Sequence, residues 1–361
     1  MRISDFTPPM VKPSVDFKVV TDAPLPPEMP FEAQTAFSLG QLLDRSVNVL
    51  NRNLGNMLKC QPAAEKMVDA LLAGGAAEVL IAEFGEQVQA KRIRWQMWAQ
   101  QLRQCGAVMT HCRETLPMEQ RQRLDDEQKF ILLDLARQPL PQVIADEFNQ
   151  IISSSNDFFD KLLELIDLIK NGYLKGYEHI LDAYAEFFKE FNDAITAEMK
   201  EWITGVDDGK KVELDVGALK AALNTLIAKY SPPESAAVLF PAPGKEGASR
   251  EEADKWREAL GLPESCLIDN GDGTFSVVMD ISPLSTMLAS LPAGGGKVTW
   301  DTAKFQAWQT GFNAQEERMK NMLQSFTQKY SNANSYHDNF NKTLSAHLSQ
   351  YADMLKAMLN F

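Results

Sequence analysis

The last sixty or so residues most constrain what this chain can fold into, because they carry one apolar stripe with the spacing of a coiled-coil helix. From Asp301 to Phe361, apolar side chains recur at mostly alternating steps of three and four, the period of a helix packed along its whole length against another helix. The stripe is Phe305, Trp308, Phe312, Met319, Met322, Phe326, Tyr330, Ala333, His337, Phe340, Leu344, Leu348, Tyr351, Leu355 and Met358, with polar Gln315 in register. Asp301 can cap the first turn, and no proline follows it. At about 1.5 Å per residue the helix would be roughly 90 Å long, so it needs a partner of similar length.

That partner is predicted upstream, between Pro141 and about Thr204, where a similar apolar cadence occurs. Its members are Phe148, Ile152, Ser155, Phe159, Leu162, Ile166, Ile169, Tyr173, Tyr177, Ile180, Tyr184, Phe187, Phe191, Ile195 and Trp202. Burying apolar surface stabilises a protein by about 25 cal/mol per Å², and a stripe left in water lacks this stabilisation. The two rods are therefore expected to pair antiparallel within one chain. Gly172 and Gly176 interrupt this rod, and they indicate either a bend or close helix crossing, or loosely packed core glycines.

Composition narrows the class of protein. The chain has 361 residues, enough for two or three domains, and a net charge of −13, which argues against a binder of nucleic acid or of anionic membrane surfaces. No run of 18 apolar residues predicts a membrane span, and the N-terminus lacks the apolar region of a cleaved signal peptide. The four cysteines include no C-x-x-C pair, and Cys105 and Cys112 are expected to be small core residues.

The chain is predicted to have a mainly α fold with five successive parts. Residues 1–33 hold seven of the 18 prolines and no helical period, so they are expected to be extended or disordered, either as a floppy tail or as an export segment. An N-terminal helical hairpin with a break at Gly74-Gly75 is predicted over residues 34–138. The first coiled-coil helix is predicted over residues 139–204. Residues 205–300 predict a small inserted α/β domain, and 301–361 the C-terminal coiled-coil helix.

Local signals detail the inserted domain. A short strand is expected at 212–214, followed by a helix that Asp215 caps. Ser249 and Glu252 form a capping box, and two apolar runs around 270–273 predict a β-hairpin. Residues 297–300 predict an edge strand. On the N-terminal hairpin, the basic cluster Lys91-Arg92-Arg94 is expected to be a solvated face.

Motifs that carry chemistry were sought and do not fit. The Asp269–Asp272 turn resembles a calcium loop, but Gly271 and Gly273 stand where oxygen ligands are needed. Gly294–Lys297 resembles a phosphate loop, but no helix is expected to follow it. The four histidines lack metal-ligand spacing, and His179 and His337 are expected to be packing residues beside the stripes. The sequence therefore predicts no enzyme, no metal site and no cofactor.

Several segments resemble one known family. Residues 303–320 (AKFQAWQTGFNAQEERMK) and 328–339 (QKYSNANSYHDN) look like the C-terminal coil of the type III secretion needle-tip proteins, the IpaD, SipD and BipD family, with most resemblance to SipD. The resemblance continues in 172–179 (GYLKGYEH), 237–243 (AVLFPAP) and 260–267 (LGLPESCL). It covers roughly residues 148–339, whereas the N-terminal hairpin matches only in kind and the segment after Asn339 departs from the family's serine-rich ending.

The resemblance implies a fold and a function. It implies a long antiparallel coiled coil shielded by an N-terminal helical hairpin, with a mixed α/β distal domain. It also implies a secreted protein that is cytoplasmic before export through a type III system, and that then caps the needle as a ring, holds secretion in check and supports assembly of the translocator pore. Partners would be the needle subunit, further copies of the chain, translocator proteins and, as in some family members, bile salts. Residues 1–33 would then be the export signal.

Candidate contact residues follow from this segment. Lys329, Tyr330, Asn332, Asn334 and Asp338 are the candidates for binding the needle or a neighbouring protomer, and the alternative is that the amides belong to a solvated coil surface. Met319, Met322 and Phe326 are candidates for an adaptable apolar groove that admits a sterol-like ligand such as a bile salt.

Two other functions fit parts of the pattern. A soluble coiled-coil chaperone or scaffold of a secretion system would share the coil, and secretion without N-terminal cleavage would argue against it. A pore-forming translocator would need hydrophobic spans that the sequence lacks.

Overall fold

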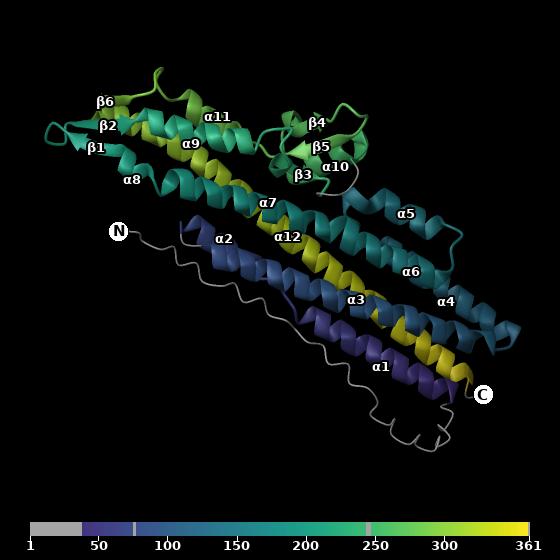
Figure 1. The fold of residues 1–361 in the computed structure, drawn as a ribbon. Helices are drawn as coiled ribbons and strands as arrows, with labels where there is room; N and C mark the ends of the chain where they lie inside the picture. Colours follow the sequence, from purple (N-terminus) through teal and green to yellow (C-terminus); the bar gives the residue numbers. More distant parts are fainter. Residues whose placement is uncertain (1–37, 75–76, 243–246, 360–361) are drawn as a thin grey trace, which may run out of the picture. The chain divides into compact units, whose positions relative to one another are not determined.

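The structure is a computed structural model that describes residues 38–74, 77–242 and 247–359. The predicted export segment, 1–33, lies outside the described residues. Figure 1 shows the chain from the N-terminal helices in purple and blue to the long C-terminal helix in yellow.

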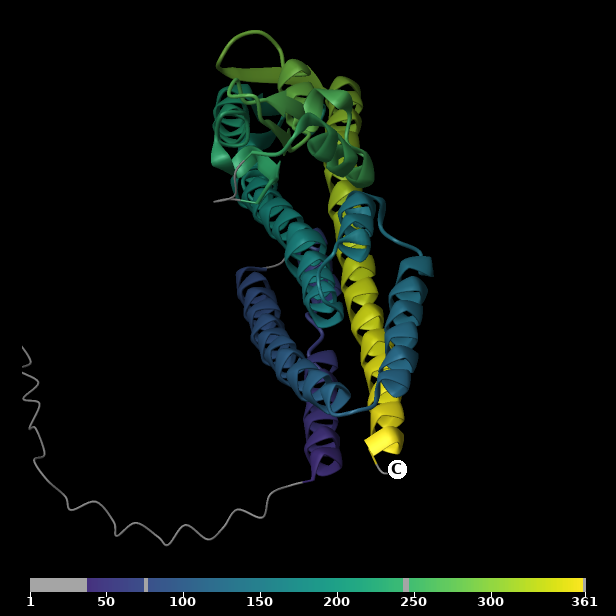
Figure 2. The same cartoon turned by 90° about the vertical axis from the view of Figure 1, so that its right-hand side faces the viewer.

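Two long helical rods pair antiparallel, as predicted. The C-terminal rod is one helix, α12 (Thr302–Leu359), whose start Asp301 caps by accepting a hydrogen bond from the Lys304 N–H at 2.8 Å. The first rod consists of α6 (Phe158–Asp167), a π-helical segment η2 (Leu168–Leu174) and α7 (Lys175–Phe191). Aromatic contacts set the register: Tyr184 with Phe326, Tyr173 with Tyr336 and Phe158 with Tyr351. Residue numbers fall along the first rod as they rise along α12, which confirms the antiparallel coiled coil (Figures 1 and 2).

The first rod is shorter than the single helix predicted over 139–204. Residues before it form a turn η1 (Gln142–Ile144) and a separate helix α5 (Ala145–Ser153), followed by a break at residues 154–157. The break coincides with a serine-rich run in which Ser154 Oγ donates to the Ile151 carbonyl at 2.8 Å. Such local side-chain bonds compete with the helical ladder, so the apolar period continues in sequence while the helix does not.

The rod also ends earlier than predicted. After α7 come a π-helical segment η3 (Asn192–Thr196) and a short helix α8 (Met199–Trp202), and the chain then becomes extended in β1 (Ile203–Val206). β1 pairs antiparallel with β2 through the turn at Asp207-Asp208-Gly209, where all three residues have positive φ. This pairing removes the last residues of the predicted helix and places them in the inserted domain.

The two mid-rod glycines have different roles. Gly172 lies within the π-helical segment, which is a local irregularity of the rod. At Gly176, a Cβ atom would come within 2.5 Å of the Trp256 ring. The close approach predicted there exists, but its partner is the indole of the inserted domain rather than a second long helix.

The N-terminal hairpin is built from α1 (Leu39–Leu58), α2 (Ala64–Leu72) and α3 (Glu78–Glu114), followed by α4 (Met118–Arg137). The turn between α1 and α2 contains Pro62, which disfavours helical backbone in the residue before it. Buried side chains of these helices, including Leu50, Trp98 and Ile131, join the same core as the two rods. In Figure 2 the hairpin helices and α4 lie alongside α12.

The inserted segment contains two small sheets. The first has the order β1-β2-β6, with β2 (Lys211–Asp215) at its centre and β6 (Lys297–Asp301) at an edge, as predicted. The second has the order β3-β5-β4, formed by β3 (Val238–Phe240), β4 (Leu267–Asp269) and β5 (Phe275–Val278). The remaining elements are α9 (Val216–Lys229), η4 (Ser235–Ala237), α10 (Arg250–Leu260), η5 (Glu264–Cys266) and α11 (Ser282–Ala289).

The predicted helix caps of this domain are present. Asp215 Oδ1 accepts from the Ala218 N–H at 2.9 Å, and Ser249 Oγ accepts from the Glu252 N–H at 3.2 Å. Between β4 and β5, the Asp269 and Asp272 side chains bond nearby backbone N–H groups of their own turn. These carboxylates therefore stabilise the β-hairpin turn, as expected.

Among the described helices, none combines the length and apolarity that crossing a membrane requires.

Candidate functional site

The residues predicted to bind a partner lie on one stretch of α12, residues 329–341, which we call the covered segment. The hairpin packs over it: the Phe84 ring of α3 meets the Tyr330 ring edge-on, with centroids 5.5 Å apart. Tyr330 and Asp338 are only 2% and 5% exposed. The covered segment is therefore a contact within this chain, and its candidate residues Tyr330, Asn334 and Asp338 face the hairpin.

A buried ion pair forms the centre of this contact. The Lys91 Nζ of α3 lies 2.8 Å from Asp338 Oδ1 and 3.0 Å from Oδ2, and both side chains are almost fully buried. Lys91 Nζ also donates to Asn334 Oδ1 at 2.6 Å. One ammonium group of the hairpin thus satisfies two side chains on adjacent turns of α12.

The turn between α1 and α2 completes the contact through Gln61. Its Nε2 donates to Asp338 Oδ2 at 2.7 Å, and its Oε1 accepts from Asn334 Nδ2 at 2.8 Å. Each hydrogen-bonding end of the Gln61 amide is therefore used across the interface. Two predicted partner residues, Asn334 and Asp338, are occupied by Lys91 and Gln61 together.

Behind this pair lies His337, which is completely buried. Its Nδ1 lies 3.1 Å from Asp338 Oδ1, and its Nε2 lies 3.0 Å from Asn341 Nδ2. A second buried ion pair, Lys170 with Glu178 at 2.6 Å, belongs to the first rod. The core between the hairpin and the two rods thus holds two cations and two anions close to an imidazole.

Burial sets the protonation states of these groups. Burial lowers the pKa of His337 to about 4, helped by the charges of Lys91 and Lys170, although the hydrogen bond to Asp338 opposes the shift. Burial would raise the pKa of Asp338, but the hydrogen bond from His337 and the charge of Lys91 lower it to about 2. At neutral pH His337 is therefore uncharged and Asp338 ionised. An imidazole that donates from Nδ1 to Asp338 and accepts at Nε2 fits the observed geometry.

The other predicted partner residues have different positions. Lys329 Nζ donates to the Ala259 carbonyl at the end of α10, at 2.7 Å, and so ties α12 to the inserted domain. Asn332 is exposed and accepts a hydrogen bond from Gln328 of the same helix at 2.9 Å. Of the two candidate asparagines, only Asn332 is a solvated surface amide, which was the alternative interpretation of these residues. Its role in binding a partner stays a prediction.

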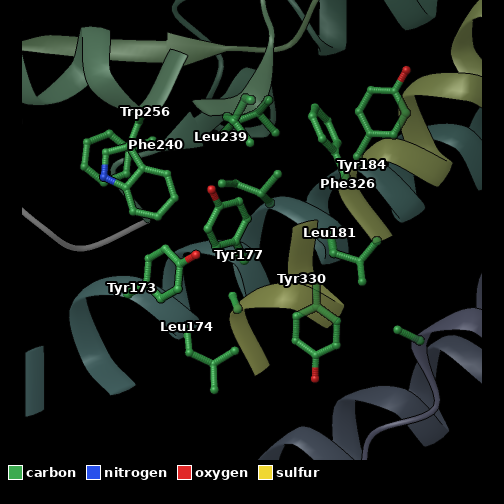
Figure 3. Close-up of a cluster of buried hydrophobic side chains, with 14 of the residues drawn as sticks. Tyr173, Leu174, Tyr177, Leu181, Tyr184, Leu239, Phe240, Trp256, Phe326 and Tyr330 are labelled. Carbon is green, nitrogen blue, oxygen red and sulfur yellow. The ribbon is translucent and has the colours of Figure 1, made fainter. Parts of the chain in front are cut away.

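The predicted ligand groove is filled by the protein itself. Met319 and Phe326 are each 1% exposed, and Figure 3 shows Phe326 beside Tyr184 of the first rod. Their rings lie 5.1 Å apart in an edge-to-face arrangement. Met322 is half-buried. These residues form part of the core in this conformation, and binding of a bile salt there stays a prediction.

The prediction for Lys91 was wrong, because Lys91 is 1% exposed rather than solvated. The sequence did carry a signal for its burial. The apolar steps of α3 run through Phe84, Val88, Trp95, Trp98 and Leu102, and residue 91 falls on the same stripe. A lysine on an apolar stripe is expected to be buried, and a buried charge needs an oppositely charged partner. Here that partner is Asp338.

Further polar pairs follow α12 toward its C-terminal end. Asn51 of α1 bonds Ser345 at 2.6 Å and Ser349 at 3.1 Å. The other pairs are Gln128 with Tyr351, Asp134 with His347, and Asp44 with Lys356. The described residues contain no group of three His, Cys, Asp or Glu side chains that could hold a metal ion. The polar side chains along this interface are joined by hydrogen bonds and ion pairs.

Comparison with known proteins gives a consistent result. A family model described as type III secretion systems tip complex components matches residues 55–359. Cell invasion protein SipD of Salmonella typhimurium is 41% identical over 214 residues, which cover 57% of this chain and 62% of the relative. Invasin IpaD of Shigella flexneri is 38% identical over 211 residues, covering 58% and 61%. The matched region thus spans about three-fifths of the length of these curated relatives.

A solved structure is similar over most of its length. The Pathogenicity island 1 effector protein from Chromobacterium violaceum has 31% sequence identity and a TM-score of 0.60, covering 87% of this chain and 96% of that protein.

Proposed function

The chain belongs to the family of type III secretion systems tip complex components, and from this premise we propose that it caps the needle of such a system and regulates secretion. In this proposal it is exported through a type III pathway, with the export signal in residues 1–33, and acts at the needle tip on the bacterial surface. There it contacts the needle subunit, further copies of itself and translocator proteins, and it supports assembly of the translocator pore.

One observation carries the mechanism: the covered segment is held by the hairpin through polar side chains. Lys91 and Gln61 bind Asp338 and Asn334, and a partner chain that offers a cation and an amide could replace them. We infer that the hairpin moves aside at the needle and that needle subunits or neighbouring protomers take its place on the covered segment. Tyr330, Asn334 and Asp338 would then become contact residues, with Lys329 and Asn332 at the border.

A reversible crosslink tests the exchange of partners. Asn51→Cys and Ser345→Cys, in a Cys60→Ser background, would place two thiols where Asn51 and Ser345 now bond across the interface. A short cleavable bismaleimide linker would hold the hairpin on α12. We expect the linked protein to lose co-sedimentation with isolated needles and the cleaved protein to regain it.

The matched control uses the same two cysteines blocked singly with a maleimide, which modifies the surface without joining the helices. Equal needle binding by the linked and cleaved proteins would show that the hairpin need not move. Labelling of isolated needles with antibody to this protein, viewed by electron microscopy, tests the location independently, because label absent from the tips would contradict it.

Bile-salt sensing is a finer part of the proposal. Deoxycholate would bind beside Met322, the half-buried member of the three groove candidates, once Met319 and Phe326 become accessible. Calorimetric titration of the full chain, compared with Met322→Ala, should show binding heat that the variant weakens. No heat with either protein would remove this part of the proposal.

A further inference from the structure

We propose that a proton on His337 takes the place of Lys91 as the cationic partner of Asp338, so that mild acid releases the hairpin from the covered segment. The inference rests on the proposed function, because it concerns the regulation of the same hairpin movement. It adds an input, the external pH, that can act before any partner arrives.

The first support is the count of buried charges. Lys91, Lys170, Asp338 and Glu178 make two ion pairs, so the cluster is neutral while His337 is neutral. A protonated His337 would add an unpaired positive charge at a site with no exposure to water, which is costly. Lys91 belongs to the hairpin, whereas the other four groups belong to the rods. If α3 leaves with Lys91, the protonated cluster is neutral again.

The second support is the geometry around the imidazole. Nδ1 already faces Asp338 Oδ1, so the incoming proton must go to Nε2. Nε2 now lies beside the Asn341 Nδ2, while the Asn341 Oδ1 is buried without a hydrogen-bond partner. A half-turn of this amide would present its oxygen to a new Nε2–H. The site therefore contains an acceptor that only the protonated histidine would use.

Within the part of the chain that the structure describes, Asp338 is the one carboxylate that acts on His337. Lys91 of α3 and Lys170 of η2 both act against its protonation, and Asp338 of α12 is the carboxylate that favours it. Glu178 of α7 is engaged by Lys170, and Cys60 faces Lys91 from the turn after α1. Asp338 is therefore shared between Lys91 and His337, and their cationic forms compete for it.

The direction of the pH effect follows from linkage. In the covered state burial lowers the pKa of His337 from 6.5 to about 4, and in the open state water restores the ordinary value. Between these two values the open state binds one more proton, so acid favours opening by up to about tenfold per pH unit. Below about pH 4 the covered state also binds the proton, so more acid no longer shifts the opening equilibrium. From about pH 7 to about pH 5 the opening equilibrium should shift roughly 20-fold.

Hydrogen exchange of the full chain measures this shift. Labelling times at about pH 5 are lengthened to compensate for slower intrinsic exchange, so that only changes in opening remain. We expect amides of α3 around residues 84–95 and of the covered segment to lose roughly 20-fold in protection. Amides of α7 around 184–191 should keep theirs. Unchanged protection of α3, or equal loss in α3 and α7, would overturn the proposal.

Two variants and one titration identify the proton site. His337→Gln should keep an uncharged amide at this position and abolish the pH response, whereas the control His111→Gln, at an exposed position of α3, should retain it. A His337→Gln protein that opens in acid like the unaltered chain would contradict the assignment. NMR titration of the unaltered protein needs no variant: His337 should titrate below about pH 5, and an ordinary value near 6.5 would also contradict it. Needle binding at neutral pH tests the proposed function separately, since it does not depend on this titration.

Discussion

The two sides of α12 are stabilised in different ways. Toward the first rod, α12 presents aromatic rings, as in the Tyr184–Phe326 and Tyr173–Tyr336 contacts. Among the described residues, one side-chain hydrogen bond crosses this seam between 158–191 and α12, from Tyr184 Oη to the Met319 carbonyl at 3.4 Å. Toward the hairpin and α4, ion pairs and amides occur from Asp338 to Lys356.

This difference indicates which contact can open. Separating the aromatic seam would expose apolar surface at about 25 cal/mol per Å², with nothing gained from water. Separating polar pairs returns their groups to water, so a net hydrogen bond contributes only about 0.5–1.5 kcal/mol. The hairpin also buries apolar side chains such as Leu50 and Trp98 in the common core, so its release has an apolar cost as well. Its ion pairs and amides can be replaced by those of a partner, so we expect the hairpin interface, rather than the aromatic seam, to exchange.

The largest expected effect is on the aromatic seam. Phe326→Ala should lower the free energy of unfolding by about 3–5 kcal/mol, because it leaves a cavity among buried rings. Urea unfolding of the full chain measures this loss. Leu133→Ala, at a position 54% exposed on α4, is the control and should change stability by no more than about 0.5 kcal/mol. Similar losses in both would contradict the division between core and exchangeable surface.

The next effect is confined to the hairpin. Lys91→Met leaves Asp338 buried without its cation, which should cost about 3 kcal/mol. Native-state hydrogen exchange should show the loss in α3 and the covered segment and not in α7. Adding Asp338→Leu should restore most of the lost protection, since an apolar pair can replace a buried ion pair. Failure of the double variant to recover would mean that Lys91 acts by shape rather than by charge.

A smaller effect is expected along α12. Asn51→Ala removes hydrogen bonds to Ser345 and Ser349 and should weaken docking of α1 by about 1 kcal/mol. The measurement is the protection of α1 amides. Asn56→Ala on the same helix, where the residue is exposed, serves as the control. A larger loss from Asn56→Ala than from Asn51→Ala would place the docking surface elsewhere on α1.

The smallest effect concerns the outer ion pair of Asp44 with Lys356, whose side chains are 46% and 39% exposed. Lys356→Ala should cost about 0.2–1 kcal/mol at low salt and less at high salt, because exposed pairs are screened. Urea unfolding at two salt concentrations checks this. A cost that is independent of salt would indicate that the lysine stem packs against apolar surface.

Much of the fold was predictable because it rests on local periodicity. The α12 stripe and its pairing with the first rod follow from apolar spacing, and the cap follows from the residue type of Asp301. The break after Ser153 was not predictable in this way, because the apolar period continues through it while side chains compete for the backbone. Strand β3 was missed because it is only three residues long and is stabilised by its partner β5.

The candidate site was predictable only in part. The segment around Tyr330 was singled out, but its partners Gln61 and Lys91 are more than two hundred residues away in sequence. No local pattern specifies such pairs. The sequence did place Lys91 on an apolar stripe, and that conflict between charge and position was the available sign of a buried ion pair.

The sequence separation within the polar contact has a consequence for how the chain folds. Gln61 and Asp338 are 277 residues apart, while α1 and α3 are close in sequence and can associate soon after both are synthesised. Closing so long a loop has an entropic cost that local pairing does not have, and such contacts form late. The hairpin would therefore exist as a preformed unit before α12 is synthesised, and the docking of the two would follow the pairing of α1 with α3.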